Sequence, residues 1–130
     1  MADYQPVYEN GAQPFTATTS AAVTGGRVVA ISGNGTVAHA GAASTVACGV
    51  AAHDAASGAQ VTVWPLEGVV HEIEAASAIT AAGGVQTAAN GQVDPATTSI
   101  GAASAAGTLI GRALTTAAGS PLKVRFVGSR

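Results

Sequence analysis

The chain has 130 residues, which suits one domain with one hydrophobic core. Hydrophobic residues make up 48% of it, but much of that fraction is alanine, which buries little surface, so we expect assembly with other subunits to add buried area. Only 9% of the residues are charged and the formal net charge is -2, which argues against nucleic acid or an anionic membrane as the main partner.

The first 13 residues predict an extended arm, followed by a single β domain at residues 14–130. This arm has no apolar signal segment, and no later stretch is apolar enough to span a bilayer, so we expect neither classical secretion nor membrane insertion. Two interpretations of the arm remain open, a disordered terminus or a segment that docks along a partner. The residues that would make the docking contacts are Tyr4, Pro6, Val7 and Tyr8.

A β-hairpin is predicted at residues 25–37, after a short strand at 14–18. The hairpin sequence, GGRVVAISGNGTV, has β-branched residues that suit a pleated surface, and Asn34 and Gly35 tolerate the positive φ angles of a tight turn. A similar sequence, GGVQTAANGQV, follows at residues 83–93 and predicts a second hairpin.

The two hairpins head two halves with the same order of motifs. Each hairpin is followed by a connector, a strand that starts near a glycine, a turn rich in Ala and Gly, and an alternating strand. The spacing between matching residues is 58 for Gly26 and Gly84, 56 for Asn34 and Asn90, and 62 for Gly49 and Gly111. We therefore expect an internal repeat interrupted by short insertions or deletions.

The remaining segments predict one more strand and at most one helix. A strand at residues 68–74 places Val69, His71 and Ile73 on one face. Residues 75–82 have the composition of a short helix, whereas residues 95–108 are expected to be irregular. The predicted fold class is all-β, a small antiparallel barrel or sandwich with an extended N-terminal arm and at most one short helix. The internal repeat allows this fold to be built from two similar β units.

No arrangement of residues predicts catalysis. The spacings of His39, His53, His71, Asp54, Glu72 and Glu74 match no zinc-binding pattern, and Cys48 is alone. We expect His71 to be a partly buried histidine or one at the rim of a sheet, and Cys48 to be a small buried residue. We therefore predict no catalytic, cofactor-binding or metal-binding residues, no cofactor and no enzymatic activity.

The few charges are distributed unevenly along the chain. Residues 1–94 contain all seven acidic residues, whereas residues 95–130 contain four basic residues and no acidic one. In a symmetric assembly these basic residues can pair with the acidic surface of a neighbour. The candidate subunit-interface residues are Arg112, Lys123 and Arg125.

The order of the motifs resembles one known family. The motifs lie at residues 11–16, 23–29, 48–51, 58–63, 68–70, 83–84, 110–114 and 124–127. In this order they are similar to the small capsid decoration, or cement, proteins of tailed bacteriophages, and the resemblance covers most of residues 11–128.

This resemblance implies a non-catalytic virion protein. Such a protein is made in the host cytoplasm, binds the outer surface of an icosahedral head and bridges neighbouring capsomers as a homotrimer, with the major capsid protein as its partner. One alternative is a small β domain of a tail, fibre or surface assembly that binds a protein or a glycan through a loop with an exposed Trp64. A second is an enzyme with an unconventional site at His53, Asp54 and His71.

Overall fold

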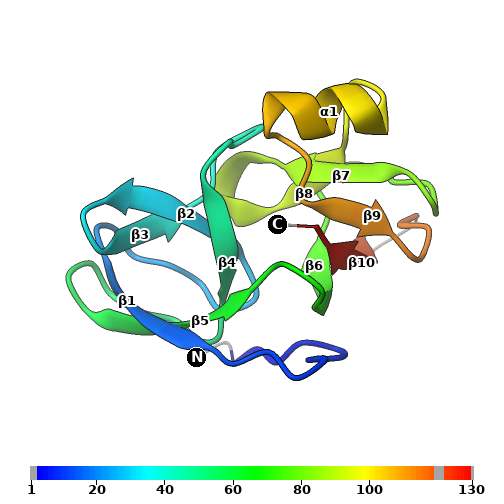
Figure 1. The fold of residues 1–130 in the computed structure, drawn as a ribbon. Helices are drawn as coiled ribbons and strands as arrows, with labels where there is room; N and C mark the ends of the chain where they lie inside the picture. The colour runs from blue at the N-terminus through cyan, green and yellow to red at the C-terminus, as the bar shows by residue number, and fades with distance from the viewer. Residues whose placement is uncertain (1–2, 119–121, 130) are drawn as a thin grey trace.

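The computed structural model describes residues 3–118 and 122–129 and consists of two five-stranded β units that lie side by side (Figure 1). The first unit is formed by β1 to β5 and the second by β6 to β10, and one short helix, α1, lies at one end of the second unit. The all-β fold class, the two similar units and the limit of one short helix are confirmed.

The first unit is a closed barrel with the strand order β1-β3-β2-β4-β5. Strands β1 and β3 are parallel, and the other neighbours are antiparallel. The strands are β1 (Phe15–Thr19), β2 (Val28–Gly33), β3 (Thr36–His39), β4 (Ala47–Ala51) and β5 (Gln60–Pro65).

The second unit is a sheet with the order β6-β10-β9-β7-β8. A parallel bridge between Ala75 and Val93 joins the end of β6 to β8, where the first unit has the parallel pair β1 and β3. The elements are β6 (Val70–Glu74), β7 (Gly84–Thr87), the 3-10 helix η1 (Ala89–Gly91), β8 (Val93–Pro95), α1 (Ile100–Ala106), β9 (Gly111–Ala113) and β10 (Lys123–Gly128).

The two units have the same topology, because β2, β3, β4 and β5 are connected as β7, β8, β9 and β10 are, and β6 takes the place of β1. The strand registers match as well. Val29 lies opposite Gly49, and Val85 lies opposite Gly111, so equivalent residues are 56 positions apart up to the hairpins and 62 apart in the next strand. The predicted internal repeat is therefore present in the fold.

Equivalent residues also fill the two interiors. The first interior contains Val23, Val29, Val37, Ala51, Val61 and Val63, with Ala17, Cys48 and Ala55 packed against them. The equivalent residues of the second are Ile79, Val85, Val93, Ala113, Val124 and Phe126, with Ile73, Ile110 and Ala117. The second interior has larger side chains, since Phe126 replaces Val63 and Ile73 replaces Ala17.

A shared apolar layer joins the units. Val28, Ala30, Ala40, Val50 and Leu66 of the first unit belong to the same hydrophobic cluster as the second interior. Because these side chains are on the outer surface of the first unit, the first unit covers part of the second.

Both predicted hairpins are present, with the Asn34-Gly35 turn between β2 and β3 and the Asn90-Gly91 turn between β7 and β8. The predicted equivalence of Gly26 and Gly84 is wrong. Gly84 pairs with Arg112 as Val28 pairs with Val50, so Gly84 matches Val28.

The residue that matches Gly26 is Ala82, which also has a positive φ. The two values are +83° for Gly26 and +73° for Ala82. Each residue donates its backbone N–H to an equivalent carbonyl, that of Ala51 for Gly26 and that of Ala113 for Ala82, at 2.8 Å. The same backbone geometry therefore occurs with an alanine in the second unit, where it costs conformational energy.

The helix predicted at residues 75–82 is wrong. Bridges from Ala75 to Val93 and from Ile79 to Ala117 hold this segment extended, so tertiary pairing outweighs the helix propensity of alanine. The helix α1 lies instead in the segment predicted to be irregular, where the Ser99 side chain accepts a hydrogen bond from Ala102 N and Gly107 ends the helix in a left-handed conformation. No helix in the described part of the chain is long and apolar enough to cross a membrane.

Candidate functional site

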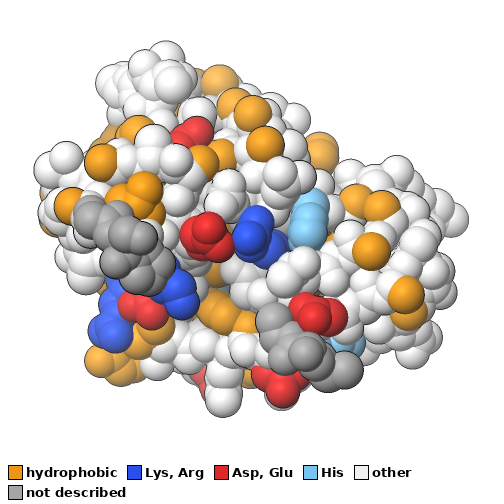
Figure 2. All heavy atoms as spheres, turned by 180° about the vertical axis from the view of Figure 1, so that it is seen from behind, with side chains coloured by type: hydrophobic (Ala, Val, Ile, Leu, Met, Phe, Trp, Pro, Cys, Tyr) orange, Lys and Arg blue, Asp and Glu red, His pale blue; other side chains and the backbone are white. Residues whose placement is uncertain are grey.

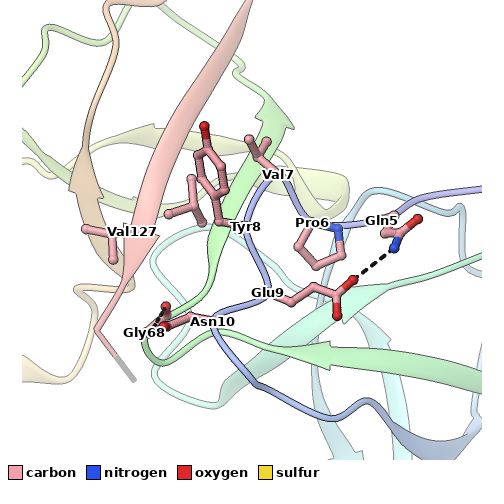
Figure 3. Close-up of a pocket in the computed structure, with 9 residues that line it drawn as sticks. Gln5, Pro6, Val7, Tyr8, Glu9, Asn10, Gly68 and Val127 are labelled. Atoms are coloured by element: carbon pink, nitrogen blue, oxygen red, sulfur yellow. Dashed lines mark hydrogen bonds between the residues drawn. The ribbon is translucent and has the colours of Figure 1, made fainter.

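The described part of the arm, residues 3–13, begins on the first unit, where Tyr4 N donates to the carbonyl of Ala52 at 2.7 Å, and continues along the second unit. Backbone hydrogen bonds join it to the outer edge of β6: Val7 N donates to the carbonyl of Val70 at 2.9 Å, and Val70 N donates to the carbonyl of Tyr8 at 3.0 Å. Further along, the Asn10 side chain donates to the carbonyl of Gly68 at 3.3 Å (Figure 3). The arm therefore adds a short strand-like segment to the edge of the second sheet.

Tyr4 is the anchor of the arm. Its hydroxyl lies 2.7 Å from Nδ1 of His71 and accepts a 3.3 Å hydrogen bond from the backbone N–H of Glu72. The rings of Tyr4 and His71 are stacked, with centroids 5.8 Å apart. His71 is fully buried, so the prediction of a partly buried or rim histidine is wrong. The Tyr4 ring covers a position that the strand alone would leave at the edge.

Burial sets the protonation state of this pair. It lowers the pKa of His71 to about 4, although the hydrogen bond to the carbonyl of Pro65 opposes the shift. Burial also raises the pKa of Tyr4 above its usual value. The Pro65 carbonyl can only accept, so Nε2 of His71 donates to it at 2.8 Å, and Nδ1 accepts from the Tyr4 hydroxyl.

The other three predicted arm residues differ in exposure. Pro6 is buried and Val7 is half-buried, whereas the Tyr8 residue is 63% exposed. Figure 3 shows the Tyr8 ring on one side of the arm and the hydrogen-bonded pair of Gln5 and Glu9 on the other. Tyr8 is thus the one of the four that presents a large apolar surface without any rearrangement of the arm.

A shallow hollow runs beside the arm. It is lined by Gln5, Pro6, Val7, Tyr8, Glu9, Asn10, Gly68, Val70 and Val127. Sequence reasoning placed the arm residues together but missed Gly68, Val70 and Val127. The two valines lie opposite each other in the pairing of β6 with β10, a long-range contact that no local pattern indicates.

The three predicted interface residues do not form one cluster. Arg125 Nε lies 2.9 Å from Glu72 Oε2 of the same chain, whereas Arg112 and Lys123 are exposed and take part in no ion pair among the described residues. On the face shown in Figure 2, acidic and basic side chains lie next to each other and do not form large patches of one sign. Among the cations that the structure describes, Arg112 and Lys123 are therefore free to meet a neighbour.

The histidines and Cys48 have structural roles. His39 Nε2 accepts from Thr24 N at 2.8 Å, and His53 Nε2 accepts from Thr62 N at 3.2 Å. The Cys48 thiol lies 3.6 Å from the carbonyl of Val29, and burial raises its pKa. Within the described residues, no group of three or more His, Cys, Asp or Glu side chains could hold a metal ion.

The sequence of the chain matches a known family over nearly its whole length. Residues 8–127 match the family described as phage cement protein. The chain belongs to the phage cement protein family. This membership confirms the family expected from the sequence and makes this cement protein a structural component of the phage virion.

A comparison of structures supports the fold. The cement protein is similar to a chain described as head fiber gp8.5 N base in bacteriophage phi29, with a TM-score of 0.68 and 24% sequence identity. The alignment covers 90% of this chain and 93% of the fibre chain. No curated protein matches the chain in sequence.

Proposed function

We propose that this cement protein binds the outer surface of an icosahedral phage head and stabilises it by bridging neighbouring capsomers as a homotrimer. The observation that carries the proposal is the family match over residues 8–127. The major capsid protein is the partner, and the protein is made in the host cytoplasm before it joins the outer capsid surface. It acts through binding and not through catalysis, and it needs no cofactor.

The arm and its hollow are the proposed capsid-binding surface. Tyr8 is exposed beside the apolar side chains of Val70 and Val127, so a capsid segment can bury the tyrosine ring there. Tyr4, Pro6 and Val7 hold the arm in place, because all three are buried or half-buried, and Val7 N and the Tyr4 hydroxyl are hydrogen-bonded to β6. Many such modest contacts, repeated over the shell, add up to a large stabilisation.

Contacts between subunits are proposed at Arg112, Lys123 and Arg125. Arg112 and Lys123 are exposed on β9 and at the start of β10, and a neighbour's acidic residues can neutralise them. Arg125 already pairs with Glu72, so it contributes less. Sedimentation velocity tests the trimer directly, and Arg112→Glu should weaken it more than Arg125→Glu.

Binding to heads is tested by co-sedimentation. Purified protein is mixed with undecorated heads, the heads are pelleted and the bound copies are counted. We expect binding to saturate, with three copies of the chain at each binding site on the head. A monomeric protein that stays in the supernatant at all concentrations would contradict it.

A second candidate function is that of a fibre base on the virion. The likeness to the head fiber N base favours it, since the alignment covers nearly all of both chains. In both functions the protein binds the virion. A fibre base would in addition bind a further protein or a glycan on its side that faces away from the head. A partner protein or glycan captured by heads already carrying this chain, but not by bare heads, would favour the fibre base.

A further inference from the structure

The two units differ in how well one end of each unit is covered, although their residues correspond position by position. Phe15 pairs with Val63 as His71 pairs with Phe126, so Phe15 and His71 are equivalent. In the same way Ile31 pairs with Val37 and Thr87 pairs with Val93. The equivalent of Cys48 is Ile110, one residue before Gly49 and Gly111.

The equivalent positions have opposite exposure. His71 and Thr87 are both 0% exposed in the second unit, whereas Phe15 is 43% and Ile31 is 57% exposed in the first. Ile110 is 0% exposed, whereas Cys48 is only half-buried. The first unit therefore leaves open an end that the second unit keeps closed.

The cover on the second unit comes from elsewhere in the same chain. The Tyr4 ring stacks on His71, and the segment after β3 closes over Thr87. Ser44 N donates to the Thr87 hydroxyl at 2.8 Å, and that hydroxyl donates to the carbonyl of Gly41 at 2.7 Å. The arm and the first unit together thus supply the cover.

The hairpin tips show the same asymmetry. The tip of the second hairpin sits on the first unit: a Cβ built at Gly91 would lie 2.6 Å from the carbonyl oxygen of Val28, and Arg27 Nη1 donates to the Asn90 carbonyl at 2.9 Å. A Cβ built at Gly35, the equivalent glycine of the first hairpin, would meet nothing within 4 Å. The Gly35 carbonyl accepts from Thr18 N of the same unit at 3.3 Å, but no contact equivalent to that of Gly91 with the other unit is present among the described residues.

The open end of the first unit is a hollow lined without any charged residue. Its apolar side chains are those of Phe15, Ala17, Ile31, Val37 and Cys48, and Gly33, Gly35, Thr16 and Thr36 complete it. Exposed apolar side chains gathered in one hollow mark an interaction surface, and the absence of charge favours an apolar, uncharged occupant.

We propose that this open end, defined by Phe15, Ala17, Ile31, Val37 and Cys48, is the surface that contacts a second copy of this chain. Within one chain, the first unit, which has the same topology, already helps to cover the equivalent end of the second unit. The first unit cannot cover its own end, so the unit that closes it comes from another copy. Such a contact joins different surfaces of the two copies, which closes into a ring when the rotation fits. The inference rests on the proposed trimer and assigns its interface.

Sedimentation velocity and the reactivity of Cys48 test the inference together. Ile31→Asp places a charge in the hollow at an exposed strand position, so the fold should survive, and Phe15→Ser is a second variant if Ile31→Asp does not fold. Ala78→Asp adds the same charge on an exposed loop of the second unit and is the control. Circular dichroism checks the fold of each variant.

The inference predicts a trimer for the wild type and for Ala78→Asp, and at least about a tenfold weaker association for Ile31→Asp. Alkylation of Cys48 should slow about tenfold as the wild type associates, but not in Ile31→Asp. If Ile31→Asp remains a trimer with a protected Cys48, the assigned interface is wrong and the trimer stands. If the wild type is a monomer, the proposed trimer fails and the inference fails with it. If Cys48 is protected only when heads are present, a capsid segment occupies the surface and the inference alone is overturned.

Discussion

Tyr4 and His71 are joined by a 2.7 Å hydrogen bond that fixes the N-terminal arm to the second unit. The bond determines the histidine tautomer, because Nε2 must donate to the carbonyl of Pro65. It also determines where Tyr8 lies, since Tyr8 follows Tyr4 along the same edge of β6. The position of the proposed capsid-binding tyrosine therefore depends on the buried one.

Tyr4→Phe should lower the free energy of unfolding by about 1–3 kcal/mol. The substitution keeps the ring stack but leaves Nδ1 of His71 and the N–H of Glu72 without the hydroxyl. Urea denaturation measures the effect. Tyr8→Phe is the matched control, and because Tyr8 is exposed it should change stability by less than about 0.5 kcal/mol. Equal losses for the two variants would show that the hydroxyl of Tyr4 does not hold the arm.

Acidification should destabilise the protein through His71. Its pKa is about 4 when folded and 6.5 in the reference state, so the unfolded chain binds more protons between these values and stability falls as pH falls through this window. The full effect is up to about 3 kcal/mol, and it is complete below about pH 4. His71→Phe, which copies Phe15 of the first unit, should flatten the pH dependence of the urea midpoint between pH 4 and 6.5. An unchanged slope in this variant would assign the acid sensitivity to other groups.

Gly111→Ala should destabilise the protein by at least about 2 kcal/mol. A Cβ at this position would lie 2.7 Å from Phe126 Cδ2 and would also collide with the backbone of Val127. Gly101→Ala is the contrasting variant, because a Cβ there meets nothing within 4 Å and alanine favours helix α1, with an expected gain of about 0.5–1 kcal/mol. Thermal unfolding of both variants compares them. Tolerance of Gly111→Ala would mean that β9 and β10 pack less closely than described.

Ala82→Gly should stabilise the protein by about 0.5–1 kcal/mol, because relief of the left-handed conformation exceeds the entropy that glycine adds to the unfolded chain. Ala82 has φ +73° where the first unit has Gly26. The neighbouring change Ala81→Gly is the control and should destabilise by a similar amount, because Ala81 does not have a positive φ. Calorimetry measures the stability of both variants. A loss of stability in Ala82→Gly would show that the left-handed conformation of Ala82 is not strained.

The repeat could be predicted from the sequence because its signals are local. Asn34-Gly35 and Asn90-Gly91 specify their turns within two residues, and the glycines at 49 and 111 mark strands that approach a neighbour closely. The exact register could not be predicted. The paired glycines at 83–84 suggested a match with Gly26, but the structure places Ala82 there, and only the strand pairing reveals it.

The helix and the site depended on contacts that lie far apart in the sequence. Residues 75–82 carry helix-forming alanines, but bridges to Val93 and Ala117 decide their conformation. The helix α1 had readable signals in Ser99 and Gly107 at its two ends. The arm's tyrosines could be selected by type, whereas the partner of Tyr4, His71, is 67 residues away and no pattern connects the two.

Co-sedimentation of Tyr8 variants with undecorated phage heads is the most direct test of capsid binding through the arm. We expect the wild type to bind to saturation and Tyr8→Ser to bind at least about tenfold more weakly without a change in the unfolding midpoint. Leu114→Ser, at another exposed large apolar residue, should bind as the wild type does. Undiminished binding of Tyr8→Ser would show that the arm is not the capsid contact. Failure of the folded wild type to bind heads at all would contradict the proposal that this cement protein decorates the capsid.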